Sequence, residues 1–222
     1  MALIRPIHGE MSGSIAGNTY SRNKGGLYVK RAAHPTNPNS ELQQAARATL
    51  QSISAGWASL TDAQRDNWNQ YAAANPRINR LGESFFATGH QWYVALNARL
   101  ADVQLPGVKS APVRNTVPTL SAATVTSLVD PDTVAVTWSG AGILPADVLS
   151  VWLTPQHSAG SSPNFRQARS WGASEPAMTS PTNITGKRLL TEGNTYTAYV
   201  MVVTAEGLAS VPIKATLVPA YP

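Results

Sequence analysis

The sequence predicts a two-part protein: an α+β N-terminal segment, with a β-ribbon arm and about three helices, followed by an all-β sandwich. Two observations support this prediction. Residues 40–102 repeat apolar side chains at helical spacing behind capping residues, whereas the residues from 111 onward form short β-rich runs. Glycine and proline, sixteen of each in 222 residues, separate these runs as turn residues do.

An extended, glycine-rich and basic arm is predicted over residues 1–38. Within it, residues 9–31 combine β-forming side chains with Asn23-Lys24-Gly25-Gly26, a sequence that suits a hairpin tip. A two-stranded ribbon is marginally stable in water, so we expect the arm to lie on its own domain or to add to a neighbour's sheet. Residues 34–39 contain two prolines and form a stiff connection to the helices.

The helical module is predicted over residues 39–105. Its first helix begins with a capping box at Ser40, and its second with one at Thr61, because a hydroxyl precedes Gln by three residues at both places. Asn75-Pro76 ends the second helix, and a third helix is expected over residues 84–102. The first helix carries an apolar stripe of Leu42, Ala46, Leu50, Ile53 and Trp57.

A linker is predicted over residues 106–117 and a β-sandwich over residues 118–222. The run at 133–138, TVAVTW, alternates strictly between large apolar side chains and Thr or Ala, and further runs follow at 148–153 and 195–203. Strands at this spacing, separated by glycine and proline, are typical of a sandwich. The segment 156–181 is rich in Ser, Gly, Pro and Ala and receives no strand assignment.

The C-terminal half resembles fibronectin type III and other immunoglobulin-like domains. Residues 134–138, VAVTW, are similar to the second strand of that family, and the resemblance implies that Trp138 is buried between the sheets. Glu192-Gly193-Asn194-Thr195-Tyr196 is similar to the turn before the tyrosine corner, which implies a structural role for Tyr196. Residues 203–210 resemble the hairpin that follows.

The N-terminal half resembles a second family. Residues 12–26 read SGSIAGNTYSRNKGG, and they are followed by Pro35-Thr36-Asn37-Pro38-Asn39, Trp57, Leu60-Thr61, Gln64-Arg65 and Trp68-Asn69. This arrangement resembles a small module in predicted structural proteins of tailed bacteriophages and prophages. The resemblance covers most of residues 9–97 and implies a virion setting more firmly than a position within the virion.

The net charge of +5 is distributed unevenly along the chain. Residues 1–110 contain eleven Lys and Arg against six acids, whereas residues 111–222 contain six of each sign. The predicted docking residues of the arm lie in a window without acids, and they are Arg22, Lys24, Tyr28, Lys30 and Arg31. Such a patch suits an acidic surface or a phosphate backbone; no nucleic-acid-binding motif accompanies it, so we expect a protein surface.

Catalytic, cofactor and metal sites are not predicted. The chain has no cysteine, which excludes disulfides, thiol catalysis and cysteine-ligated zinc. The four histidines, His8, His34, His90 and His157, are scattered, and none has metal-site spacing. No GxSxG, P-loop or GxGxxG motif occurs. We therefore expect no enzyme and no cofactor, and we expect His90 to be a packed or interfacial side chain.

The tryptophans fall into two groups. Those of the helices lie at helical spacing with Tyr93, and we expect them to pack in the core; they are Trp57, Trp68 and Trp92. Trp171 lies in a polar stretch without periodic apolar partners. This leaves two interpretations of Trp171, as an exposed contact residue or as a plug at one end of the sandwich.

Together these features predict a bacteriophage virion structural protein, specifically a capsid decoration (cement) protein with an N-terminal docking module and an outward Ig-like domain. The alternatives are a tail or fibre-attachment subunit and a carbohydrate or cell-surface binding module. The predicted partners are other virion proteins of the capsid or tail lattice, further copies of the chain and, for a binding module, a host-surface glycan.

The location of the protein is also an expectation. The first fourteen residues hold no apolar run of signal-peptide length, and no stretch reaches the ~20 apolar residues of a membrane span. We therefore expect synthesis in the host bacterial cytoplasm, incorporation into the virion and no membrane span.

Overall fold

A computed structural model describes residues 2–3 (backbone only), 11–33, 36–79, 81–113, 116–128, 130–158 and 160–217. The chain divides into two compact units. Unit 1 consists of Met1–Ala95 and Lys109–Ala111, and unit 2 of Leu96–Val108 and Pro112–Pro222. The third helix, α3 (Gly89–Asp102), begins in unit 1 and ends in unit 2.

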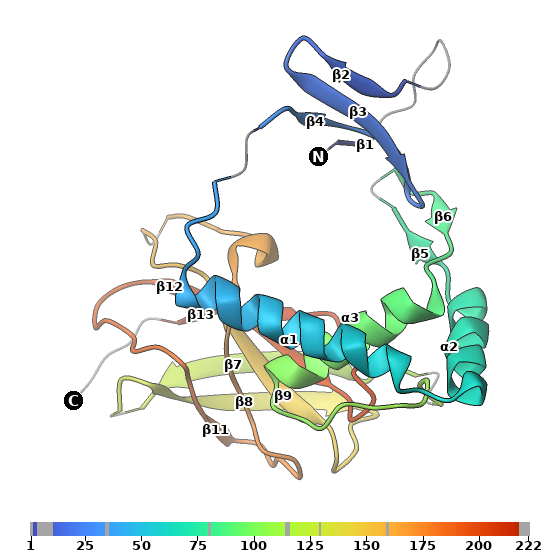
Figure 1. The fold of residues 1–222 in the computed structure, drawn as a ribbon. Coiled ribbons are helices and arrows are strands. Elements are labelled where there is room, and N and C mark those ends of the chain that lie inside the picture. Colours follow the sequence, from blue (N-terminus) through green and yellow to red (C-terminus); the bar gives the residue numbers. More distant parts are fainter. Residues whose placement is uncertain are drawn as a thin grey trace. The chain divides into compact units, whose positions relative to one another are not determined.

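Unit 1 opens with a four-stranded antiparallel sheet, drawn in blue in Figure 1, so the expected ribbon has two additional strands. The strands are β1 (Ala2–Leu3), β2 (Gly13–Ile15), β3 (Asn18–Asn23) and β4 (Gly26–Arg31), in the order β1-β4-β3-β2. The predicted hairpin tip lies between β3 and β4. There the side-chain oxygen of Asn23 accepts a hydrogen bond from the Gly25 N–H at 2.9 Å, and Gly26 adopts a φ of +113°.

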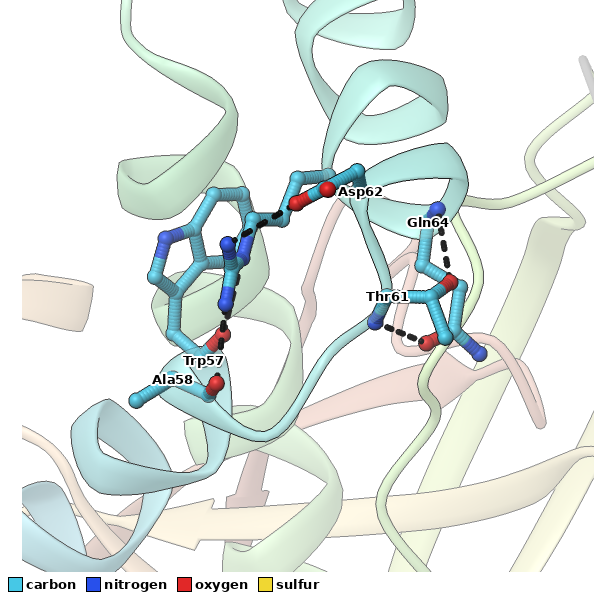
Figure 2. Close-up of polar contacts among 6 residues, drawn as sticks. Trp57, Ala58, Thr61, Asp62 and Gln64 are labelled. Atoms are coloured by element: carbon cyan, nitrogen blue, oxygen red, sulfur yellow. Dashed lines mark hydrogen bonds and ion pairs between the residues drawn. The ribbon is translucent and has the colours of Figure 1, made fainter.

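Three helices follow: α1 (Glu41–Ala58), α2 (Asp62–Ala74) and α3. The capping box at Thr61 is present, since its hydroxyl accepts from the Gln64 N–H and the Gln64 side chain accepts from the Thr61 N–H (Figure 2). The box expected at Ser40 is absent, because the Ser40 side chain makes no capping hydrogen bond. Helix α3 begins at Gly89, later than expected, behind an unpredicted box formed by Thr88 and Gln91.

The late start of α3 has a local cause. The strands β5 (Arg77–Ile78) and β6 (Ser84–Phe85) pair as a short antiparallel hairpin, which occupies the residues where the helix was expected to begin. Its turn includes Gly82 at a φ of +80°, a backbone conformation that glycine adopts without strain.

Arg65 joins the end of α1 to the start of α2. Its guanidinium donates to the carbonyl of Ala58 at 2.8 Å and of Trp57 at 3.4 Å, and it forms an ion pair with Asp62 at 3.2 Å (Figure 2). The last carbonyls of a helix have no partner within it, so Arg65 supplies a donor to the Ala58 carbonyl and adds to the Leu60 N–H that already donates to the Trp57 carbonyl.

An aromatic cluster forms the core of unit 1, as expected for the helical tryptophans. Tyr93 contacts Trp57 and Trp68 edge to face, each at a ring-centroid distance of 5.5 Å, and Tyr71 contacts Trp92 at 5.4 Å. Trp68 is fully buried. Burial raises the pKa of the Tyr93 hydroxyl above its usual value, because the phenolate form is costly to desolvate.

The apolar stripe of α1 is largely uncovered. Helix α1 contains no buried residue, and Leu42 and Leu50 are 84% and 48% exposed. Only its last turns contribute to the core, through partly buried Ile53 and Trp57. The stripe at helical spacing thus predicted the helix correctly. It did not predict that the apolar side chains of the first three turns are exposed.

Unit 2 is a seven-stranded antiparallel sandwich (Figure 1), which confirms the predicted fold. One sheet has the order β11-β8-β7 and the other β10-β9-β12-β13. The strands are β7 (Thr119–Ser127), β8 (Thr133–Ala141), β9 (Val148–Leu153), β10 (Arg169–Ala173), β11 (Thr182–Thr185), β12 (Tyr196–Val203) and β13 (Ile213–Leu217), with a 3-10 turn at Phe165–Gln167.

Two inner faces close the core of the sandwich. The strictly alternating strand β8 contributes Val134 and Val136, and β12 is buried along its whole length. The strand β10 lies inside the segment 156–181, which sequence analysis left unassigned.

The second half of α3 and the residues after it pack on the sandwich within unit 2. Val103 belongs to a buried cluster with Val148, Met201 and Val203. Lys187 forms an ion pair with Asp102 at 3.5 Å.

The predicted linker remains a prediction, although several of its residues are held by hydrogen bonds. The Val108 N–H donates to the side chain of Asn97 at 2.7 Å. The next residue of the segment, Lys109, accepts a hydrogen bond at its carbonyl from Trp68 Nε1 at 2.9 Å. Residues 114 and 115 of this segment lie outside the described residues.

Candidate docking surface

All five residues predicted for docking lie on the N-terminal sheet. Arg22 is in β3, and Tyr28, Lys30 and Arg31 are in β4, while Lys24 is in the turn between the two strands. The hairpin sequence therefore brings them together on one small element, as expected. Its strand register then decides which of them can touch the same partner.

The register separates the basic side chains, which corrects the expectation of a single patch. Arg22 pairs with Leu27, and Arg31 pairs with Asn18. Residues opposite one another point to the same face and neighbours along a strand to opposite faces, so Arg22 and Arg31 share one face. Lys30 projects from the other face.

The face with the two arginines has an apolar centre. Tyr20 and Val29 form the pair between the arginines, and Leu27 lies opposite Arg22. Arg22 and Arg31 are four positions apart in the register, which is about 13 Å along the strands. An apolar strip with a cation at each end is complementary to an apolar segment flanked by acidic groups.

The opposite face is polar. The Ser14 and Thr19 hydroxyls lie 2.9 Å apart, and Thr19 pairs with Lys30. Ser21 pairs with Tyr28 on the same face. Tyr28 and Lys30 are thus among hydroxyl groups, and the sheet is amphipathic.

The sheet has no fully buried side chain in its described part, and its apolar residues Tyr20, Leu27 and Val29 are only half-buried. None of the described residues from 11 to 33 is buried, and Ile15 on the edge strand β2 is 58% exposed. A small sheet that buries no side chain contributes little hydrophobic stabilisation, and an exposed edge strand offers unpaired N–H and C=O groups. These are the properties of an element that gains stability from a partner.

Trp171 is not an exposed contact, so that interpretation is wrong and the alternative of a plugged sandwich holds. Its side chain is 1% exposed and its Nε1 donates to the carbonyl of Arg188 at 2.9 Å. The pairing of β10 with β9 shifts register between Ser170 and Gly172, which places the indole in the core. Gly186 lies directly against the ring, where a Cβ would overlap it.

Trp138 is only partly buried at the margin of the core. Trp138 lies in the second half of β8, beyond Val134 and Val136 on the same face, where the strand is no longer fully buried. The buried tryptophan implied by the family resemblance is therefore Trp171 in place of Trp138.

Tyr196 occupies the predicted tyrosine corner. It is 8% exposed, and its hydroxyl accepts a hydrogen bond from the Thr191 N–H at 3.2 Å. This bond ties the start of β12 to the preceding turn, five residues upstream, as such corners do.

The histidines that the structure describes are packing residues. His90 stacks edge to face on Trp57 at 5.3 Å, and its Nε2 is 3.3 Å from the Ser54 hydroxyl. In unit 2, His157 Nε2 is 3.0 Å from the Thr197 hydroxyl. His8 and His34 lie outside the described residues.

Unit 2 also has a polar cleft that sequence analysis missed. It has a volume of about 600 Å³ and is lined in part by Asp102, Ser174, Glu175, Asn183, Thr185 and Lys187. No sequence motif predicts this cleft, since its lining residues come from three separate segments. Among the described residues, no three His, Cys, Asp or Glu side chains are placed to hold a metal ion.

The strand order and the tyrosine corner place unit 2 in the class of fibronectin III-like sandwiches. No family model and no curated protein matches the chain. Among solved structures, a Fn3-like protein from Clostridium thermocellum is 24% identical, with 51% of this chain and 96% of that chain covered and a TM-score of 0.30.

Two further structures are similar at lower identity. The third fibronectin III domain of the human KIAA0343 protein is 20% identical, with 53% of this chain and 97% of that chain covered and a TM-score of 0.28. Domains 1–6 of the surface layer protein SbsC are 14% identical, with 80% of this chain and 22% of that chain covered and a TM-score of 0.29. Separately, no helix in the described ranges is long and apolar enough to cross a membrane.

Proposed function

We propose that this chain is a non-catalytic structural protein of a tailed-bacteriophage particle and that its N-terminal sheet docks it on the capsid as a decoration protein. The observation that carries the docking role is the amphipathic sheet, which buries no side chain fully in its described part and whose apolar centre lies between Arg22 and Arg31. The phage setting rests on the resemblance of residues 9–97 to a module of phage structural proteins. The preferred partner is an apolar surface with acidic margins.

The sandwich supports an outward position in this proposal. Its core is complete within unit 2, from Val134 and Val136 on one sheet to Val200 and Val202 on the other. Such a domain needs no neighbour for its stability, unlike the N-terminal sheet, and so suits a projecting role. Burial of Trp171 removes the aromatic contact on which the alternative of a carbohydrate-binding module depended.

A particle-rebinding assay tests the docking role. Particles that lack the chain are incubated with the full chain or with a chain that starts at Ala32, and bound protein is quantified. We expect the truncated chain to lose binding while the helices and the sandwich stay folded by circular dichroism. Binding of the truncated chain at full occupancy would show that the sheet is not the docking element.

The strand register supplies a matched control. Arg22→Ala/Arg31→Ala removes two charges from the apolar face, whereas Lys24→Ala/Lys30→Ala removes two charges elsewhere on the hairpin. We expect the arginine pair to weaken binding about tenfold or more, because charge-assisted contacts next to an apolar core are partly desolvated. The lysine pair should have a much smaller effect. Equal losses would mean that net charge alone determines binding.

Imaging of particles with and without the chain locates its position. Density lost from the capsid surface would agree with decoration. Density lost from the tail would instead select the alternative of a tail or fibre-attachment subunit, which can use the same docking sheet.

A further inference from the structure

The loop between β5 and β6 is built around a single asparagine. The Asn79 side-chain oxygen accepts from the N–H groups of Leu81 at 2.8 Å and Glu83 at 3.0 Å. Its side-chain nitrogen donates to the Glu83 carboxylate at 3.0 Å and to the backbone carbonyl of Gly25 at 2.9 Å. An asparagine amide has two donors and two acceptor sites, so all four are used.

Three of these four partners belong to the loop itself, and the fourth comes from the β3–β4 turn. The loop thus fixes the Asn79 side chain so that one of its amide N–H groups can donate to a carbonyl of another segment. In this sense the loop is a receptor for the β3–β4 turn. Asn79 is partly buried, so a missing partner would leave an unsatisfied donor. No buried side chain of residues 11–33 accompanies this contact in the described part of the sheet.

The connection between the sheet and the helices permits this turn to reach elsewhere. Residues 32–40 are exposed wherever they are described, and nine residues extend up to about 30 Å. At the helical end, Arg47 donates to the Asn37 side chain and Gln44 donates to the carbonyl of Asn39, each at 2.9 Å. The connection is therefore held on α1 at one end, while at the other end the Ala32 N–H donates to the carbonyl of Gly17, in the β2–β3 turn of the sheet, at 2.7 Å.

We propose that, among neighbouring copies, the Asn79 loop of one chain receives the β3–β4 turn of another. The exchanged contact is chemically identical to the internal one, so it costs little, as in domain swapping. The equilibrium between the internal and the exchanged contact then depends on the local concentration of copies and on strain in residues 32–40. From the proposed function this inference takes only the presence of side-by-side copies, and concentrated free protein satisfies that condition as well.

Cross-linking of a mixture tests the exchange directly, because the chain has no cysteine of its own. A Lys24→Cys chain is mixed with a Leu81→Cys chain at high concentration and treated with a short bis-maleimide. Exchange predicts a linked pair of twice the 23.5 kDa chain mass, with residues 24 and 81 joined by mass spectrometry. No linked pair in the mixture, with internal linkage in a chain carrying both cysteines, would overturn the proposal.

Two controls make the result specific. Gln43→Cys on exposed α1 replaces Leu81→Cys to measure random collisions, and it should give at least about fivefold less product. Asn79→Asp/Glu83→Gln in the Leu81→Cys chain keeps an acceptor for the loop N–H groups and removes the donor to Gly25. Loss of one hydrogen bond predicts about a fivefold reduction in product, and an unchanged yield would contradict the receptor role.

The outcome is separable from that of the docking experiment. If no exchange is detected but the chain that starts at Ala32 fails to bind particles, docking stands and the exchange is wrong. If exchange occurs but the truncated chain binds particles fully, the exchange stands and the docking role of the sheet is wrong.

Discussion

Gly193 and Gly207 provide a matched pair of substitutions in the sandwich. They lie in the turns before and after β12, with φ values of +73° and +85°. They differ in their surroundings. A Cβ at Gly193 meets nothing within 4 Å, whereas a Cβ at Gly207 would lie 2.7 Å from the carbonyl oxygen of Leu96 in α3.

The expected magnitudes follow from this difference. Alanine in a left-handed conformation costs about 1–2 kcal/mol, and the lower entropy of its unfolded chain returns about 0.4–1 kcal/mol. Gly193→Ala should therefore destabilise unit 2 by about 1 kcal/mol. Gly207→Ala must in addition displace the backbone at Leu96, and overpacking adds about 1–3 kcal/mol.

Hydrogen exchange of the β12 amides is a suitable assay, because the slowest amides of a buried strand report unfolding of the unit that contains it. The excess cost of Gly207→Ala over Gly193→Ala measures how firmly the second half of α3 is held against the turn at Gly207. The Arg99 guanidinium, which donates to the Gly207 carbonyl at 2.5 Å, belongs to the same contact. Equal effects of the two substitutions would refute the assignment of residues 96–108 to unit 2.

Four further substitutions have defined outcomes. Tyr196→Phe should destabilise unit 2 by about 1–2 kcal/mol in chemical denaturation, since it leaves the Thr191 N–H without its partner. Trp171→Ala should cost about 3–5 kcal/mol through a core cavity, and Trp138→Ala less because that ring is only partly buried. Because burial raises the pKa of Tyr93, the stability that its neutral hydroxyl gives unit 1 is fully present below pH 10.0 and is lost as the pH rises through the folded-state pKa. Tyr93→Phe should reduce this alkaline loss of stability in pH-dependent melting.

The sandwich was predictable because its signals are local. Alternation in 133–138 and the turn before Tyr196 correspond directly to β8 and to the tyrosine corner. The buried tryptophan was not predictable in the same way. Trp171 lies in a five-residue strand with a shifted register, where no alternation is visible, and only the nearby Gly172 and Gly186 hint at close packing.

The sequence placed the five predicted docking residues on one hairpin, but it did not separate them into two faces. The hairpin tip was predicted, but the register that follows from it was not: pairing of Asn23 with Gly26 makes Arg22 pair with Leu27 and Arg31 with Asn18. Strand β1 carried no signal, because two residues far from the hairpin show no periodicity. The stripe of α1 indicated a helix, but periodicity alone does not specify what covers it.

Contact between Trp171 and Gly186 has a consequence for sequence variation. The Trp171 ring occupies the space that a side chain at position 186 would need, so neither position can change freely while the other is retained. A side chain at position 186 requires a smaller residue at 171, and in a chain carrying Trp171→Leu the change Gly186→Ala should become tolerable. In related chains the two positions should therefore covary, and a tryptophan at the first should be accompanied by glycine at the second.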